Sequence, residues 1–262
     1  MNIARKVLLL LALVSLIAQS KPPFIMTSVP KGGTHLLFKV VNLLTDGNNL
    51  PHRQRATGNV NRSEHERLIR LYEGYTKQLY HLHYDAHNLS VVTKDKPKIL
   101  FIYRDPRDQI ASFVPFIRRE NFPEISWRII HNIDPVIFTL PDLELQRALI
   151  LNIKSYYDLF IGWKDHPQAY AVRFEDLVGP KGGGSLEAQL REIINIGRHI
   201  GIHVSRKQAL EVADKLFGNT WTFRKGQIGA WKTEFSEENK QLFKEHAGQL
   251  LIDLGYERDF NW

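Results

Sequence analysis

Cysteine is absent from this chain of 262 residues. Disulfide bonds and chemistry that needs a thiolate are therefore excluded. A zinc site would then need histidine and carboxylate ligands, and no HExxH-like spacing of such residues occurs. We accordingly expect that the protein has no metal site.

Internal repeats and any linker of domain-boundary size are also lacking. The composition is that of a soluble globular protein, with 43% hydrophobic and 24% charged residues. A chain of this length can bury a sizeable core within one large domain. We therefore expect a single domain over residues 21–262.

Dense basic clusters and recognisable nucleic-acid-binding modules are lacking as well, although the chain is basic overall. The formal net charge is +7 and the sequence pI is about 9.5. Such an excess is either a solvated basic surface or a match for an anionic partner, such as a nucleotide, nucleic acid, sulfated glycan or acidic membrane. Without a module or a dense cluster, nucleic acid is disfavoured.

The N-terminus carries one long apolar run. Arg5 and Lys6 precede an almost wholly apolar stretch at residues 7–18, which matches a secretory signal and is shorter than the about 20 residues of a membrane span. A strand is expected from Phe24, so a cleaved leader would leave little chain before the fold. We predict a signal or anchor segment at residues 1–20, with export or membrane association. A helix packed on the domain and a cytoplasmic location are the alternatives.

Three short apolar runs are predicted to be buried strands, at residues 24–29, 98–103 and 169–174. Helices are predicted to follow the first two, over residues 34–44 and from Pro106. Strands that alternate with helices form a parallel sheet covered on both faces. The predicted fold class is therefore α/β, with a central parallel sheet flanked by helices.

The clearest helix lies near the end of the chain. Ser236 is its expected N-cap, apolar residues recur to Leu254, and Gly255 is expected to end it. The glycine-rich tract Lys181–Ser185 is predicted to be a flexible surface loop.

The turn after the first strand, Pro30–His35 (PKGGTH), has the composition of an anion-binding loop. Glycines allow the backbone to approach an anion closely, and the next helix offers free N–H groups. Lys31 adds a cation and Thr34 a hydroxyl. A P-loop kinase or NTPase would need GxxxxGK[ST], with its lysine after the glycines. The sequence thus predicts a P-loop-like cradle that is not a Walker loop, an ordinary glycine turn being the alternative.

A second polar motif, Tyr103–Ser112 (YRDPRDQIAS), ends a predicted strand and opens a helix. Arg104 is placed at the carboxyl edge of the sheet, where ligands bind in open α/β folds. An arginine there can hold a phosphate through two parallel hydrogen bonds. Ser112, two turns into the helix, can add a hydroxyl. A plain ion pair and a solvated serine are the alternative.

These motifs resemble those of the sulfotransferases that use 3′-phosphoadenosine 5′-phosphosulfate (PAPS). The first is similar to the family's 5′-phosphosulfate loop, PKSGT, and the second to its 3′-phosphate motif, whose arginine and serine are also eight positions apart. A third stretch at residues 223–232 (FRKGQIGAWK) resembles the family's RKGxxGDWK, which closes over the 3′-phosphate. The end of the last helix is also similar.

The resemblance implies that PAPS is the co-substrate, that no metal is needed, and that Lys31 neutralises charge on the leaving group. It also implies a set of donor-binding residues. These are Lys31, Gly32, Gly33, Thr34, His35, Arg104, Ser112, Phe174, Phe223, Arg224, Lys225 and Gly226.

The chain departs from the family pattern at three positions. Gly32 replaces a serine and Ala230 replaces an aspartate. Phe174 stands where family members often carry a tyrosine beside the adenine, and a phenylalanine can stack without hydrogen bonding. Residues 115–147 match no motif and are expected to build the acceptor site.

Two histidines in an extended segment before the second motif are candidates for the catalytic base. Histidine titrates in the range that general-base catalysis needs, and the family's base belongs to a His-Leu pair in this region. His81 is the better match and His83 the rival, because alternate residues of a strand face the same side. With Asp85, His87 and Asn88 they form no known metal-ligand spacing.

The sequence therefore predicts transfer of a sulfuryl group from PAPS to a hydroxyl or amine, which releases adenosine 3′,5′-bisphosphate. The acceptor is expected to be a small molecule, a lipid or a glycan. A small-molecule P-loop kinase and a non-catalytic nucleotide- or glycan-binding relative are the alternatives.

Overall fold

The computed structural model of the chain describes residues 24–45, 56–58, 78–120, 134–218 and 224–262. The predicted signal or anchor segment at residues 1–20 lies outside them, and so does Phe223. Within the described ranges, no helix combines the length and the apolar character that crossing a membrane requires.

A five-stranded parallel sheet lies at the centre of the described residues, in the order β2-β3-β1-β4-β5. The three predicted strands are confirmed to within a residue. The strand bounds are β1 Phe24–Ser28, β2 Ala56–Gly58, β3 Gln78–Leu82, β4 Lys98–Tyr103 and β5 Ala169–Arg173. Because parallel strands share one direction, the residues that follow β1, β3, β4 and β5 meet at one edge of the sheet.

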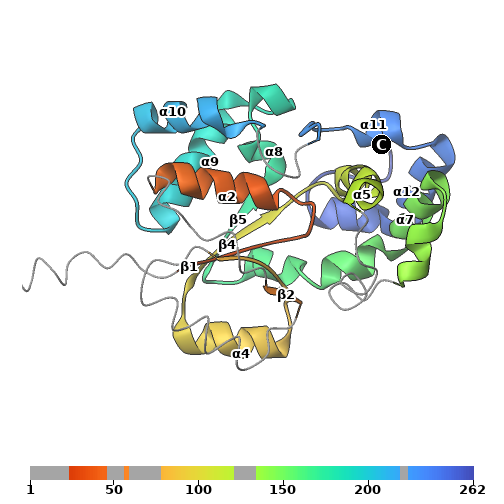
Figure 1. The fold of residues 1–262 in the computed structure, drawn as a ribbon, viewed down its shortest axis with the longest axis horizontal. Coiled ribbons are helices and arrows are strands. Elements are labelled where there is room, and N and C mark those ends of the chain that lie inside the picture. The colour runs from red at the N-terminus through yellow and green to blue at the C-terminus, as the bar shows by residue number, and fades with distance from the viewer. Residues whose placement is uncertain (1–23, 46–55, 59–77, 121–133, 219–223) are drawn as a thin grey trace, which may run out of the picture.

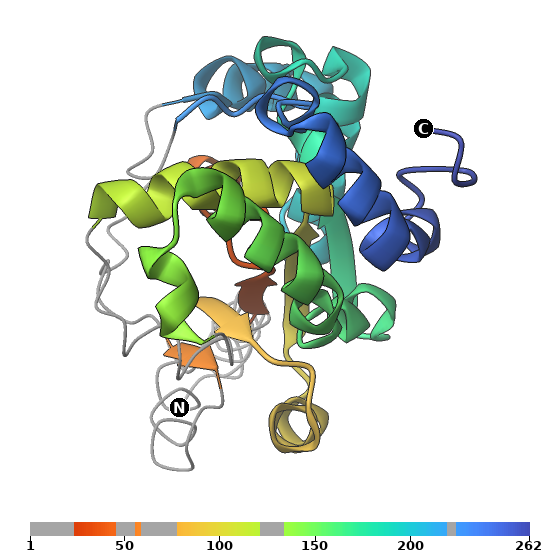
Figure 2. The same ribbon diagram turned by 90° about the vertical axis from the view of Figure 1, so that its right-hand side faces the viewer.

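Helices cover both faces of the sheet. Figure 1 shows α2, α9 and α10 together on one side and α4 on the other, and Figure 2 shows α5 and α7 in front of the strands. The α-helices are α2 Thr34–Leu44, α4 Ala86–Asp95, α5 Pro106–Glu120, α7 Asp142–Asp158, α8 Phe174–Leu177, α9 Leu186–His199, α10 Arg206–Leu216, α11 Trp231–Glu234 and α12 Glu237–Asp253. The 3-10 helices are η1 Pro135–Thr139, η2 Ile161–Asp165 and η3 Pro180–Gly182.

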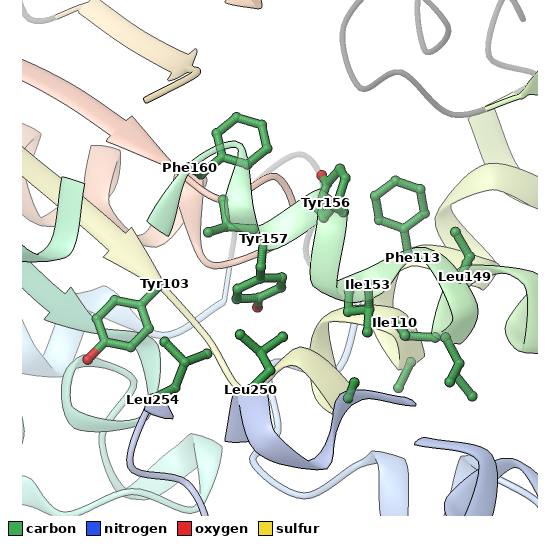
Figure 3. Close-up of a cluster of buried hydrophobic side chains, with 14 of the residues drawn as sticks. Tyr103, Ile110, Phe113, Leu149, Ile153, Tyr156, Tyr157, Phe160, Leu250 and Leu254 are labelled. Carbon is green, nitrogen blue, oxygen red and sulfur yellow. The ribbon is translucent and has the colours of Figure 1, made fainter. Parts of the chain in front are cut away.

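Each face of the sheet carries its own apolar core, because successive side chains of a strand point to opposite faces. Leu100 and Ile102 of β4 pack against α2, α9 and α10. Phe101 and Tyr103 of the same strand pack on the other face, against α5, α7 and α12. Figure 3 shows side chains of β4, α5, α7 and α12 pointing into this second core.

The predicted helix ends are found where local chemistry marks them. The Asp105 carboxylate accepts the Arg107 backbone N–H (2.9 Å) at the start of α5. Ser236 accepts the Asn239 backbone N–H (3.2 Å) at the start of α12, and Gly255 follows its last turn with φ +73°. These ends could be predicted from the sequence because a capping residue bonds backbone groups only a few positions away.

The glycine-rich tract at residues 181–185 lies largely at the surface, as its composition predicts, but contacts with residues 226 and 228 anchor it. Gly182 is buried in η3, and its carbonyl accepts the Ile228 backbone N–H (2.9 Å). A Cβ at Gly182 would lie 2.6 Å from the Gly226 carbonyl oxygen, so only glycine allows the two segments to approach this closely.

Candidate functional site

The first loop, residues 30–35, turns sharply between β1 and α2. The Gly32 N–H donates to the Val29 carbonyl (2.8 Å), and Gly33 takes φ +112° as the N-cap of α2. A Cβ on Gly32 would lie 2.7 Å from the same Val29 oxygen. The departure from serine at this position therefore fits the path of the loop, and α2 opens with its N–H groups at the carboxyl edge of the sheet.

Helix α5 contacts the first loop through two of its side chains. The Lys31 ammonium lies over the Phe116 ring, 3.6 Å from its centroid. The Gln109 side chain donates to the Pro30 carbonyl (2.8 Å). The first two motifs thus meet, and Phe116, which the sequence did not single out, lies beside the lysine.

A chain of side-chain hydrogen bonds joins the first loop to His81. The buried Ser28 Oγ lies 2.8 Å from Thr34 Oγ1 and 3.0 Å from His81 Nδ1. The Ser28 carbonyl oxygen lies 3.2 Å from the same ring nitrogen. Since Ser28 ends β1 and His81 lies on the neighbouring β3, the sheet itself sets this contact.

The two candidate histidines have different surroundings, which their spacing in the sequence could not show. His81 bonds to Ser28, on the side of the first loop. His83 lies beyond the end of β3, with its ring edge-on to Phe160 (5.1 Å between centroids). Near it, Asp85 caps α4 through the Asn88 backbone N–H (2.9 Å).

Arg104 is buried at the end of β4, among groups from the second motif, from the third and from the segment that follows β5. Its guanidinium lies over the Phe174 ring, 4.2 Å from the centroid, and its Nη2 donates to the Gln227 carbonyl (2.6 Å). Asp108 is 3.5 Å from the same nitrogen. Arg104 Nε is buried and has no hydrogen-bond partner within the described residues. A buried donor without an acceptor is costly unless a ligand supplies one.

The Phe174 ring lies between Gly33 of the first motif and Arg104 of the second. A Cβ on Gly33 would lie 2.9 Å from the Phe174 ring. The ring is buried, with the Arg104 guanidinium over it. The phenylalanine thus contacts both anion-binding segments.

Asp108 links the second motif to the third segment, residues 224–232. This buried carboxylate accepts the backbone N–H groups of Gly229 (2.7 Å) and Trp231 (3.1 Å). Burial raises its pKa, while Arg104 and the two N–H groups act in the opposite direction. This role was not predicted from the sequence, although the carboxylate stands four residues after Arg104 in the same motif.

The cations of the third segment are held by acceptors of the protein. Arg224 Nη2 donates to the Ala111 carbonyl (3.0 Å) and to the Glu234 carboxylate (3.0 and 3.1 Å). Lys225 Nζ donates to Glu234 (2.8 Å). Ala111 precedes Ser112 in α5, so Arg224 is bonded to the residue next to the predicted serine of the second motif.

Glu175 carries the largest carboxyl shift at this edge. Part of the residue reaches the surface, but its carboxylate accepts the Asp105 N–H (3.0 Å) and the Tyr256 hydroxyl (2.9 Å). Burial raises the pKa of Glu175 to about 7, against the lowering effects of the Asp105 N–H and Arg104. This carboxyl therefore titrates near neutrality, directly after Phe174.

The structure brings the predicted donor-binding residues of its described ranges to one edge of the sheet. They come from the first loop, from Arg104 and Ser112, and from the third segment. His35 and Ser112 are half-buried there, and Gly226 takes φ +61°. Lys225 is exposed and Phe223 is not among the described residues. An edge with loop amides, two arginines and a buried unpaired donor can hold an anion with separated phosphate groups.

Comparison with known proteins identifies a family that this chain resembles. The model of the family described as "Sulfotransferase domain" matches residues 21–179. Sulfotransferase 6B1 of Danio rerio is 28% identical over 197 residues, covering 65% of this chain and 57% of that protein. The Gorilla gorilla gorilla protein of the same name is 30% identical over 190 residues, covering 65% and 56%. The chain thus spans less than two thirds of these relatives.

Two solved structures share the fold. Mouse sulfotransferase SULT7A1 complexed with PAP has a TM-score of 0.62 at 19% identity, covering 91% of this chain and 88% of that one. Retinol dehydratase in a complex with retinol and PAP has a TM-score of 0.56 at 15% identity, covering 90% and 83%.

Proposed function

The chain belongs to the sulfotransferase domain family, and from this premise we propose that it transfers a sulfuryl group from PAPS to a hydroxyl or amine of an acceptor. Adenosine 3′,5′-bisphosphate (PAP) would be released. PAP is also the nucleotide in the mouse sulfotransferase and retinol dehydratase complexes. We thus propose both the substrates, PAPS and a hydroxyl or amine acceptor, and the reaction.

The observation that carries the proposal is the convergence of Arg104 and Arg224 from distant segments. Arg104 has a buried Nε that lacks an acceptor, and Arg224 uses only Nη2 in its hydrogen bonds to described residues. Nitrogens of both guanidinium groups remain for a phosphate, and Ser112 lies beside the Arg224 anchor. We assign the 3′-phosphate to these three residues.

The first loop is the proposed site of the 5′ end. Thr34 and the N–H groups of Gly33 and His35 at the start of α2 would orient it, and Phe174 would lie beside the adenine. PAPS supplies the sulfuryl group and a phosphate leaving group. Lys31 would neutralise the charge that grows on the bridging oxygen, which is the largest kind of catalytic contribution in such transfers.

We assign the general base to His81 rather than His83. The Ser28 carbonyl can only accept a hydrogen bond, so its contact with His81 Nδ1 favours a proton on that nitrogen. The lone pair then lies on Nε2, which is the atom that can take the proton of an acceptor hydroxyl. His83 remains the rival candidate.

The acceptor is proposed to be a small molecule, with lipids and glycans as further classes. Retinol and androsterone are bound in the retinol dehydratase complexes. Residues 121–133, within the stretch expected to build the acceptor site, lie outside the described residues. The signal or anchor segment and any membrane association stay predictions.

The nucleotide assignment is tested by titrating the protein with PAP and with AMP. Loss of a charged partner in a desolvated site costs on the order of 2–5 kcal/mol, so PAP should bind at least about thirtyfold more tightly than AMP. Equal affinities would refute the donor assignment, and preferential ATP binding would favour the kinase.

The reaction is tested with ³⁵S-labelled PAPS against phenols, steroid alcohols, sugars and tyrosine peptides. Label should move to at least one class. Tight PAP binding with no transfer to any acceptor would favour a non-catalytic relative.

A further inference from the structure

Helix α5 contains a proline in its interior, where proline is unfavourable in a regular helix. Pro115 lies well inside α5, which continues to Glu120. A proline has no backbone N–H, so it cannot donate to the carbonyl four residues earlier, and its ring crowds that carbonyl. The carbonyl that loses its helical donor is that of Ala111.

The Ala111 carbonyl is the one to which Arg224 donates. The Arg224 Nη2 lies 3.0 Å from it, across 113 positions of sequence. Ala111 is buried, and a buried carbonyl without a donor is destabilising. The gap that Pro115 leaves in the helix is therefore filled by the arginine of the third segment.

This anchor has a consequence for the orientation of Arg224. All of its hydrogen bonds to described residues use Nη2, which donates to Ala111 and Glu234. The guanidinium is planar, and the hydrogen bonds from Nη2 to two acceptors fix the orientation of that plane. The directions in which Nη1 and Nε point are therefore fixed as well. The next residue after Ala111 is Ser112, the proposed hydroxyl partner of the same phosphate.

We propose that Pro115 is a positioning residue for 3′-phosphate recognition: by removing a helical donor, it frees the Ala111 carbonyl to hold Arg224 beside Ser112. The inference rests on the proposed function, because it assigns Arg224 to the 3′-phosphate. Pro115 then lowers the stability of helix α5 and favours binding of the 3′-phosphate. The helix would be more stable without the proline, whereas the binding site needs it.

The test is Pro115→Ala, which restores the N–H and lets it compete with Arg224 for Ala111. The melting temperature is expected to rise, because alanine is the better helix residue. Affinity for PAP should fall by about three- to tenfold, the scale of one net hydrogen bond. Affinity for AMP, which has no 3′-phosphate, should not change. A merely structural role of Pro115 would not alter the ratio of the two affinities.

Two controls complete the experiment. Asn152→Ala changes an exposed position of α7 and should improve that helix without moving the PAP-to-AMP ratio. In an Arg224→Gln background, Pro115→Ala should have no further effect on PAP affinity, since the group that it displaces is gone.

The outcomes separate the two claims. If the unmodified protein prefers PAP and Pro115→Ala keeps the full preference, or weakens PAP and AMP equally, the role of Pro115 is overturned and the proposed function stands. If the unmodified protein shows no preference for PAP, both are overturned.

Discussion

The first loop and the third segment both present cations at the carboxyl edge of the sheet, but they are held in different ways. The turn of the first loop is shaped by bonds within a few residues, such as that from the Gly32 N–H to the Val29 carbonyl, with Gln109 adding one bond from α5. The third segment is held from a distance, by Asp108, the Ala111 carbonyl and the Gly182 carbonyl. The first adjoins the candidate base, while the second lies over Arg104.

This difference predicts that the two regions govern different properties of the protein. Groups around the first loop should govern the rate, because Lys31 and His81 are the proposed catalytic groups. Groups around the third segment should govern nucleotide affinity and its dependence on the 3′-phosphate. Changes in one region should therefore leave the property of the other nearly intact.

The largest effect is expected at the base. His81→Asn should lower kcat by roughly two to four orders of magnitude, the usual scale of a general base, with little change in PAP affinity. The measurement is the steady-state rate with an acceptor from the labelled-donor screen. His83→Asn, the matched control, should do less, and the reverse ranking would exchange the two assignments.

The protonation of His81 gives a check that needs no acceptor. ¹⁵N NMR of the histidine rings, with His81→Asn to identify the signals, should show the proton on Nδ1. A proton on Nε2 in the unmodified protein would contradict the orientation that we assign to the base.

The next effect is expected at Lys31. Lys31→Ala should lower kcat by about two orders of magnitude or more, the scale of losing one charge stabiliser of the transition state. PAP affinity should change less than the rate, which is measured in the same assay. Lys154→Ala removes an exposed lysine of α7 and serves as the control. Near-normal turnover of a folded Lys31→Ala protein would remove this residue from the mechanism.

A pH dependence of stability is expected from Glu175, whose carboxyl accepts the Asp105 N–H and the Tyr256 hydroxyl. Its pKa is about 7 in the folded protein, above its ordinary value of 4.5. The folded state thus keeps a proton that the unfolded chain releases, and the free energy of unfolding should fall as the pH rises from about 4.5 to about 7. The loss is on the order of 3 kcal/mol.

Chemical denaturation at several pH values measures this slope. Glu175→Gln cannot titrate, so it should remove the slope and be the more stable protein above pH 7. An unchanged slope in this variant would assign the pH dependence to other groups.

A smaller loss is expected at Asp108. An asparagine has one acceptor oxygen, so Asp108→Asn leaves either the Gly229 or the Trp231 N–H facing an amide that cannot accept. The free energy of unfolding should drop by about 1–3 kcal/mol, and PAP affinity should fall with the third segment displaced. Asp158→Asn, which alters only an exposed pair with Lys154, is the control. Wild-type PAP affinity in Asp108→Asn would show that the segment is held independently of this carboxylate.

The smallest effect is a gain. Glu234 neutralises Arg224 and Lys225, both of which are partly exposed, and its charge opposes an approaching phosphate. Glu234→Gln keeps an acceptor oxygen and removes the charge, so PAP should bind roughly threefold more tightly at low ionic strength, and salt should reduce the gain. Glu237→Gln, which pairs only with Lys240, is the control. Weaker binding would mean that Glu234 serves as an anchor rather than a competitor.

Sequence patterns predicted some parts of this site better than others. The strand at 98–103, the helix at 34–44 and the caps at Asp105 and Ser236 were found because each is set by residues near it in the chain. The contacts that anchor the glycine-rich tract at 181–185 were not predicted, because they involve Gly226 and Ile228, more than 40 positions away. Phe116, Asp108 and Glu234 were missed as members of the site for the same reason.

Hydrophobic periodicity, glycine and capping residues act over a few positions, so the sequence alone predicted three of the five strands, the helix starts and the anion-binding turn. The three motifs that it shares with the sulfotransferases also named most of the residues at the edge. The bonds of Ser28 to His81 and Thr34, the bonds of Asp108 to the third segment and the bond of Arg224 to the Ala111 carbonyl depend on the tertiary structure. Each of these contacts pairs a donor and an acceptor from distant segments, and only the packing of β1, β3, α5 and the third segment brings them within hydrogen-bonding distance.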